Sequence, residues 1–149
     1  TQVLAIPSWC TEFMVEWSGV GPVGGTGEFA VQVSTDGGAT YLAGASDYEG
    51  PALDIRGAGG TFGTTNGIFM SLAPSLPVGG LNFGDLRMRC AASTSTLVHS
   101  QGQDSTPVRY VRTAGYVSAA GAAPTHLRFS FTNSRNIAAG ARFTPFGRG

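Results

Sequence analysis

The stretch EFAVQVSTDGGATYL, residues Glu28 to Leu42, decides the fold class. Phe29, Val31 and Val33 alternate with polar or small residues, and this period of two places three large apolar side chains on one face of a strand. The segment TDGGAT follows, and its Asp-Gly and Gly-Gly pairs supply the positive φ angles that tight turns need. A second β-prone pair, Tyr41-Leu42, comes next. The stretch therefore predicts a β-hairpin with one face in a core.

The composition of the whole chain agrees with an all-β domain. Of its 149 residues, 42% are hydrophobic and only 12% are charged, whereas ordinary globular proteins are about 25% charged. The chain contains 23 glycines, which favours many turns and short strands over long solvated helices. This length fits a single domain over residues 1–149 with a sizeable core.

The alternation of the opening stretch recurs along the chain. Three further segments place large side chains on one face: Phe13, Val15 and Trp17; Leu86, Met88 and Cys90; Leu127, Phe129 and Phe131. Strands are also expected over residues 2–6, 68–72, 108–117 and 137–146, with bulges at Gly84 and Gly140. Residues 43–67 and 93–106 are expected to be mostly irregular loops, with short strands at 53–55 and 97–98. About eight short strands in all predict an antiparallel β-sandwich or jelly roll.

The charge pattern excludes several kinds of partner. The formal net charge is zero and all nine basic residues are arginine, so nothing steers the chain toward nucleic acid or an acidic membrane. No apolar run of 18 residues is present, so membrane insertion is not expected. Zero net charge does little to keep monomers apart in solution, which favours a subunit of a permanent assembly.

The two cysteines, Cys10 and Cys90, do not predict a metal site. They lie 80 residues apart, without a CxxC motif or a neighbouring histidine. We expect free thiols, with Cys90 on a core strand; a disulfide between the two is the alternative. No cofactor or metal is expected elsewhere in the sequence.

No catalytic constellation stands out, and the chain is not expected to be an enzyme. His99 and His126 are the only histidines, and neither accompanies a GxSxG elbow. Asp47, Glu49 and Asp54 are candidate carboxylates for glycoside cleavage, but acids of this kind are common in surface loops.

Carbohydrate binding remains open on the sequence. It needs exposed aromatic faces with hydrogen-bonding groups nearby. Candidate contacts lie in the expected loops: Trp9, Tyr48, Asp47, Gln101 and Asp104. The alternative for each aromatic residue is a position in the core or in a subunit interface.

Three segments resemble structural proteins of tailed phages. They are AIPSWCTEFMVEWSGV near the start, STDGGATYLAGASDY over residues 34–48, and LRFSFTNSRNIAAGARFTPFGRG over residues 127–149. The last resembles a closing strand pair that ends in an Ile-x-x-Gly-x-Phe-x-x-Tyr-Gly strand, with Phe146 here in the place of the tyrosine. The resemblance covers about half of the chain, mostly its ends, and residues 51–124 lie outside it.

The resemblance implies a non-enzymatic virion protein. Such proteins are capsid decoration, head-fibre, spike or tail-fibre subunits on phages and gene-transfer-agent-like particles. They are frequently trimers, so a homotrimer on the particle surface is expected, bound to other capsid or tail proteins and possessing an attachment role. The alternative is a lectin-like module that recognises glycans of the host cell surface.

Overall fold

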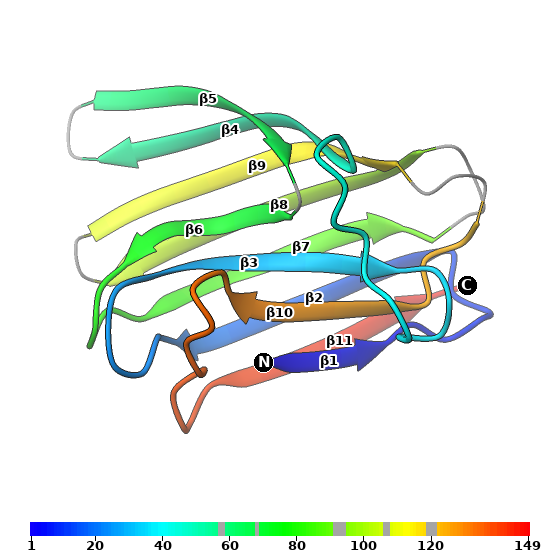
Figure 1. The fold of residues 1–149 in the computed structure, drawn as a ribbon, viewed down its shortest axis with the longest axis horizontal. Helices are drawn as coiled ribbons and strands as arrows, with labels where there is room; N and C mark the ends of the chain where they lie inside the picture. Colours follow the sequence, from blue (N-terminus) through cyan, green and yellow to red (C-terminus); the bar gives the residue numbers. More distant parts are fainter. Residues whose placement is uncertain (57–58, 68, 91–94, 106–107, 119–121) are drawn as a thin grey trace.

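The computed structural model describes residues 1–56, 59–67, 69–90, 95–105, 108–118 and 122–149. All regular elements among them are strands, which form two antiparallel sheets packed face to face (Figure 1). The strands are β1 (Gln2–Ala5), β2 (Glu12–Val20), β3 (Gly27–Ser34), β4 (Tyr48–Arg56), β5 (Gly59–Gly67), β6 (Met70–Leu76), β7 (Asn82–Arg89), β8 (Ser95–Ser105), β9 (Val108–Ser118), β10 (His126–Phe131) and β11 (Arg142–Arg148). The predicted β-sandwich is confirmed, with eleven strands instead of about eight.

The two sheets differ in size. The smaller has the strand order β1-β10-β3-β6, and the larger has the order β11-β2-β7-β8-β9-β4-β5. The edge strand β6 lies over β9, where the Thr113 hydroxyl donates a hydrogen bond of 3.0 Å to the Ser71 carbonyl. Strands β4 and β5 therefore extend beyond the smaller sheet (Figure 1). We call the side of the larger sheet that meets the smaller one its inner face, and the opposite side its outer face.

The predicted apolar faces form the core between the sheets. All twelve side chains of the four alternating segments are buried: Phe13, Val15, Trp17, Phe29, Val31, Val33, Leu86, Met88, Cys90, Leu127, Phe129 and Phe131. Aromatic rings join the two layers at the centre, with the Trp17 and Phe29 ring centroids 5.7 Å apart in an edge-to-face arrangement. The period of two in the sequence was therefore a reliable guide to the core.

A buried polar network crosses four neighbouring strands of the larger sheet. Arg109 Nε donates a hydrogen bond of 2.5 Å to one carboxylate oxygen of Asp104. The other oxygen accepts a bond of 2.6 Å from the Asn82 side-chain amide, whose own oxygen accepts a bond from the Trp17 indole. Asp104 is 0% exposed and Arg109 is 2% exposed. Charges at such depth need these partners, because an unpaired buried charge is costly.

The opening stretch forms one strand and not a hairpin. β3 pairs with β10 and β6, while Tyr41 and Leu42 lie outside the strands and Leu42 makes a single backbone bond, to Val33. The predicted second strand is wrong because Asp36 holds the turn itself. Its carboxylate accepts hydrogen bonds from the Thr40 backbone and hydroxyl, and the loop then runs across β3 (Figure 1).

Two regions predicted to be loops are largely strand. Residues 43–67 contain β4 and β5, which pair in nine consecutive positions. Residues 93–106 contain β8, which pairs with β7 on one side and β9 on the other. Their glycines and polar residues carry no strong strand signal. Here the neighbouring strands determine the structure, because strand preference depends on the packing context.

The predicted boundaries near the end of the chain are also corrected. The last strand begins at Arg142 and not at Ile137, which makes only an isolated bridge to Pro22. Gly140 has a φ of +96° and lies in the turn before β11, so it is not a bulge. The register shift near Gly84 lies on the β2 side of the β2–β7 pair, between Trp17 and Val20.

Elsewhere, β6 begins at Met70, and the predicted strand start at Ile68 lies outside the described residues. The two cysteines are free thiols, as predicted, and both are buried. They are close neighbours, and the backbone N–H of Cys90 donates a bond of 2.9 Å to the Thr11 carbonyl, next to Cys10.

Candidate binding surface

Two of the five predicted glycan contacts are buried. Tyr48 is completely buried on the inner face of β4. Its hydroxyl accepts a bond of 2.7 Å from the Val33 backbone N–H and donates one of 3.2 Å to the Leu42 carbonyl. Asp104 belongs to the buried polar network. Neither side chain has a surface to offer a ligand, so the expectation that these two are exposed is wrong.

The other three predicted contacts lie on different parts of the molecule. Trp9, between β1 and β2, is 61% exposed. Asp47, just before β4, accepts a bond of 2.6 Å from the Gly44 backbone N–H and so holds its own loop. Gln101 lies on the outer face of β8. Their role in binding stays a prediction, but the five residues do not form one site.

The predicted carboxylate group is not assembled in the described residues either. Asp47 is engaged with its loop, and Glu49 accepts a hydrogen bond from the Tyr116 hydroxyl. The Asp54 side chain lies outside the described part of the chain.

The outer face of the larger sheet carries side chains in rows that run across the strands. Register places one row over β11, β2, β7, β8 and β9: Phe146, Met14, Arg87, His99 and Ala114. The next row adds a residue of β4: Thr144, Glu16, Asp85, Gln101, Arg112 and Leu53. Acidic, basic and apolar groups therefore alternate over a broad surface.

Exposed apolar side chains are concentrated on this outer face. Nine large hydrophobic residues in the described part of the chain are exposed. Five of them belong to outer-face positions: Ile55, Phe83, Val108, Tyr116 and Phe146. Exposed apolar groups scattered singly need no explanation, whereas several on one face indicate a contact surface.

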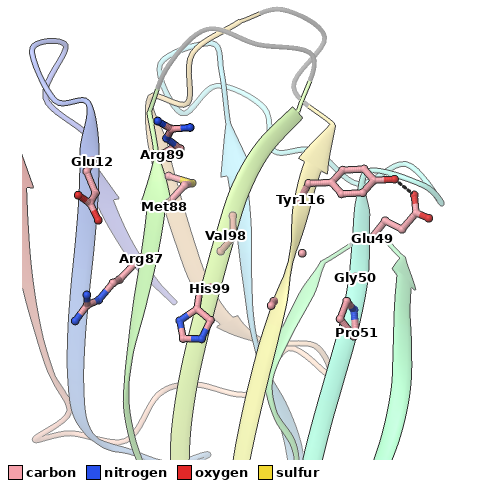
Figure 2. Close-up of a pocket in the computed structure, with 12 residues that line it drawn as sticks. Glu12, Glu49, Gly50, Pro51, Arg87, Met88, Arg89, Val98, His99 and Tyr116 are labelled. Atoms are coloured by element: carbon pink, nitrogen blue, oxygen red, sulfur yellow. Dashed lines mark hydrogen bonds between the residues drawn. The ribbon is translucent and has the colours of Figure 1, made fainter.

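A hollow of about 810 Å³ lies in this face, toward one end of the strands. Figure 2 shows Glu12, Arg87 and Arg89 on one side of it, and Tyr116 with Glu49 on the other. Its volume falls in the range of about 300–1,000 Å³ that is usual for ligand sites.

Small residues line part of the hollow where β4 and β9 pair: Gly50, Ala114 and Gly115. A Cβ atom on Gly50 would lie 2.3 Å from the Ala114 carbonyl oxygen. A Cβ atom on Gly115 would lie 2.4 Å from the Glu49 carbonyl oxygen. Neither position has room for a side chain, so both must remain glycine for β4 and β9 to pair as they do.

The two sides of the hollow have different chemistry. Arg87 is 3.8 Å from Asp85 and its side chain is 59% exposed. Arg89 makes no hydrogen bond or ion pair with the described residues, and its guanidinium group is available to a ligand. On the opposite side the hydrogen bond from Tyr116 to Glu49 raises the pKa of Tyr116 above its ordinary value. The hollow thus has one side with two arginines and Glu12, and an opposite side that is acidic and aromatic.

Further hydrogen bonds order the outer face beside the hollow. Gln101 donates a bond of 2.7 Å to Asp85 and accepts one of 3.1 Å from the Tyr110 hydroxyl. Arg112 Nε donates a bond of 3.1 Å to His99 Nε2. These bonds link β7, β8 and β9 into one polar surface.

The sequence contains a signal for one side of this surface, namely the two arginines of β7. Arg87 and Arg89 alternate in the sequence with the buried apolar residues of β7, and both are exposed. The hollow was missed because its other side comes from β4, β8 and β9, two of which were predicted to be mostly loop. The Gly50 and Gly115 pair shows its importance only once these strands are aligned.

The comparisons with known proteins add no family. No family model, no curated protein and no solved structure matches the chain. Among the described residues, no group of three His, Cys, Asp or Glu side chains is placed to hold a metal ion. A helix of the length and apolarity needed to cross a membrane is likewise missing from this part of the chain.

Proposed function

We propose that this chain is a non-enzymatic structural subunit that binds other protein subunits through the outer face of its larger sheet. The observation that carries the proposal is the concentration of exposed large apolar side chains on that face, five of nine among the described residues. Ordered charges surround them, which is the mixed character expected of a contact surface between proteins.

The dimensions of the face support the proposal. Seven strands spaced by ~4.8 Å span about 29 Å, and eight or nine residues at about 3.3 Å each extend a similar distance. The face is therefore roughly 800 Å² in area, which is the amount that each partner contributes to a standard protein interface.

The setting that the sequence resemblance suggests is the surface of a phage or a phage-like particle. In that setting the subunit decorates a capsid or forms part of a fibre or spike, and three copies are proposed to associate through their outer faces as a trimeric unit. The neutral net charge of the chain is compatible with a permanent place in an assembly.

Sedimentation-equilibrium measurements over a range of concentrations test the outer face. The wild-type chain is expected to associate, and the double variant Phe83→Ser, Phe146→Ser is expected to associate much more weakly. Val3→Ser is a matched control, since Val3 is similarly exposed but lies on β1 of the smaller sheet. A chain that stays monomeric at all concentrations, or a control variant as impaired as the double variant, contradicts the proposal.

Glycan binding is the second candidate function, and the hollow is the observation that favours it. The hollow combines a partly exposed tyrosine ring with carboxylate and guanidinium groups, which together can stack on a sugar and hydrogen-bond its hydroxyls. A glycan array tests this function: wild-type signals that disappear in Tyr116→Ala and persist in Tyr41→Ala support it. An array without signals for the wild-type chain excludes it for the glycans present.

A further inference from the structure

We propose that strand β5 is a second interaction surface, which pairs edge to edge with β5 of another copy of this chain. The inference goes beyond the proposed function because it uses the backbone of one strand and not the outer face. It begins with the four strands at the ends of the two sheets: β1 and β6 in the smaller sheet, and β11 and β5 in the larger sheet. A strand in such a position presents unpaired N–H and C=O groups, and natural proteins block it in recognisable ways.

Three of these edge strands carry features that oppose pairing with another molecule. β1 has only four residues. β11 contains Pro145, which has no backbone N–H, and the exposed residues Arg142 and Arg148. β6 contains a proline and Ser75 at a φ of +61°, and its pairing with β3 is interrupted by register shifts.

β5 has none of these features. Its sequence, GGTFGTTNG, contains no charged residue and no proline. Its nine residues pair with β4 without a register shift, from Arg56 with Gly59 to Tyr48 with Gly67. In the part of the chain that the structure describes, no strand pairs with its other side. β5 also lies where the larger sheet extends past the smaller one (Figure 1).

A second copy of the same strand fits this edge best. Two antiparallel copies of β5 related by a two-fold axis offer each other the same alternating donors and acceptors, so each backbone group finds its complement. β11 of another copy fits less well because Pro145 interrupts its row of donors. The pairing joins two larger sheets into one continuous sheet, a mode of association that uses main-chain hydrogen bonds.

The contact closes with two chains, so it predicts even numbers of subunits. A chain that also trimerises through its outer face is expected to form hexamers, whereas the β5 contact alone gives dimers. The molar mass of the assembly therefore distinguishes association through β5 from association through the outer face.

Sedimentation-equilibrium measurements on three chains test the inference. Thr61→Lys, Thr65→Lys places two charges on β5, and Thr144→Lys places one on β11 as the matched edge control. We expect an even-numbered wild-type assembly, at least a tenfold weaker association of its two-fold contact in the β5 variant, and little change in the control. A circular dichroism spectrum that matches the wild type establishes that the β5 variant is folded.

Hydrogen exchange of the wild-type chain is the second measurement, and it needs no variant. Protection of β5 amides is expected to rise with protein concentration, while protection of β11 amides does not. A wild-type monomer, an odd-numbered assembly, unchanged association in the folded β5 variant, or concentration-independent protection of β5 overturns the inference. If the double phenylalanine variant weakens the association and the double lysine variant of β5 does not, the proposed function stands and the β5 contact is refuted. If only the lysine variant weakens the association, the β5 contact stands and the outer-face contact is refuted.

Discussion

Replacement of Asp104 by asparagine is expected to destabilise the fold strongly. The change keeps the shape of the side chain but removes the negative charge from a group that is 0% exposed, beside an arginine that is 2% exposed. Loss of one partner from a buried ion pair costs about 3–5 kcal/mol in the free energy of unfolding. Domains of this kind have a total stability of about 5–15 kcal/mol, so Asp104→Asn removes a large part of it.

The assay is urea unfolding followed by circular dichroism, together with the melting temperature. At about 2–4 °C per kcal/mol for a chain of this length, Asp104→Asn is expected to lower Tm by roughly 6–20 °C. Asp85→Asn is the control, because Asp85 pairs with the exposed Arg87 at 3.8 Å. A surface pair of this kind contributes about 1 kcal/mol or less.

The double variant Asp104→Leu, Arg109→Met separates the cost of an unpaired charge from the worth of the pair. It removes both charges, and one remaining cost is the Asn82 amide, which loses its acceptor at about 1–3 kcal/mol. We expect the double variant to be more stable than Asp104→Asn. A loss below about 1 kcal/mol in Asp104→Asn, or a double variant less stable than the single one, refutes the reasoning.

Three further predictions concern single side chains. Tyr48→Phe leaves the Val33 N–H without its acceptor and is expected to cost about 1–3 kcal/mol in urea unfolding; an equal loss in Tyr41→Phe contradicts this cause. Hydrogen bonds from Thr40 lower the pKa of Asp36 to about 2, so its contribution is present above its ordinary pKa of 3.8 and is lost as pH falls through about 2. The Tm difference between wild type and Asp36→Asn is therefore expected to shrink toward pH 2, and a constant difference refutes the assignment. Burial raises the pKa of Cys90 to about 12, so Cys90 is expected to react with iodoacetamide at pH 8 only after unfolding in urea, and rapid labelling of the folded chain contradicts this.

The core could be predicted from the sequence because its signal is local. Phe29, Val31 and Val33 alternate within one strand, and any sheet that buries one face must bury them together. The partners of that strand could not be predicted in the same way. The Asp-Gly-Gly turn favours a hairpin, but Asp36 holds a loop that crosses the sheet, and β3 pairs instead with strands far away in the sequence.

The candidate surface was harder to predict, because the strands that form it are distant from one another in the sequence. Tyr48 and Asp104 are polar residues in segments rich in glycine and serine, and such segments usually form exposed loops. In the fold, each is buried by strands that are distant in sequence and completes its hydrogen bonds there. The hollow is lined by residues of strands far apart in the sequence, and no local pattern reveals that Gly50 and Gly115 lie side by side there.

In the hollow, the backbone geometry and the side-chain chemistry depend on different residues. The close pairing of β4 and β9 requires glycine at both Gly50 and Gly115, since neither position has space for a Cβ atom. The chemistry of the hollow is fixed by Arg87, Arg89 and Tyr116, which stand on the solvent side of the sheet and support no part of the core. These side chains can be replaced by others while the backbone around the hollow keeps its form. Substitutions at these positions can therefore change what the hollow binds while the fold stays the same.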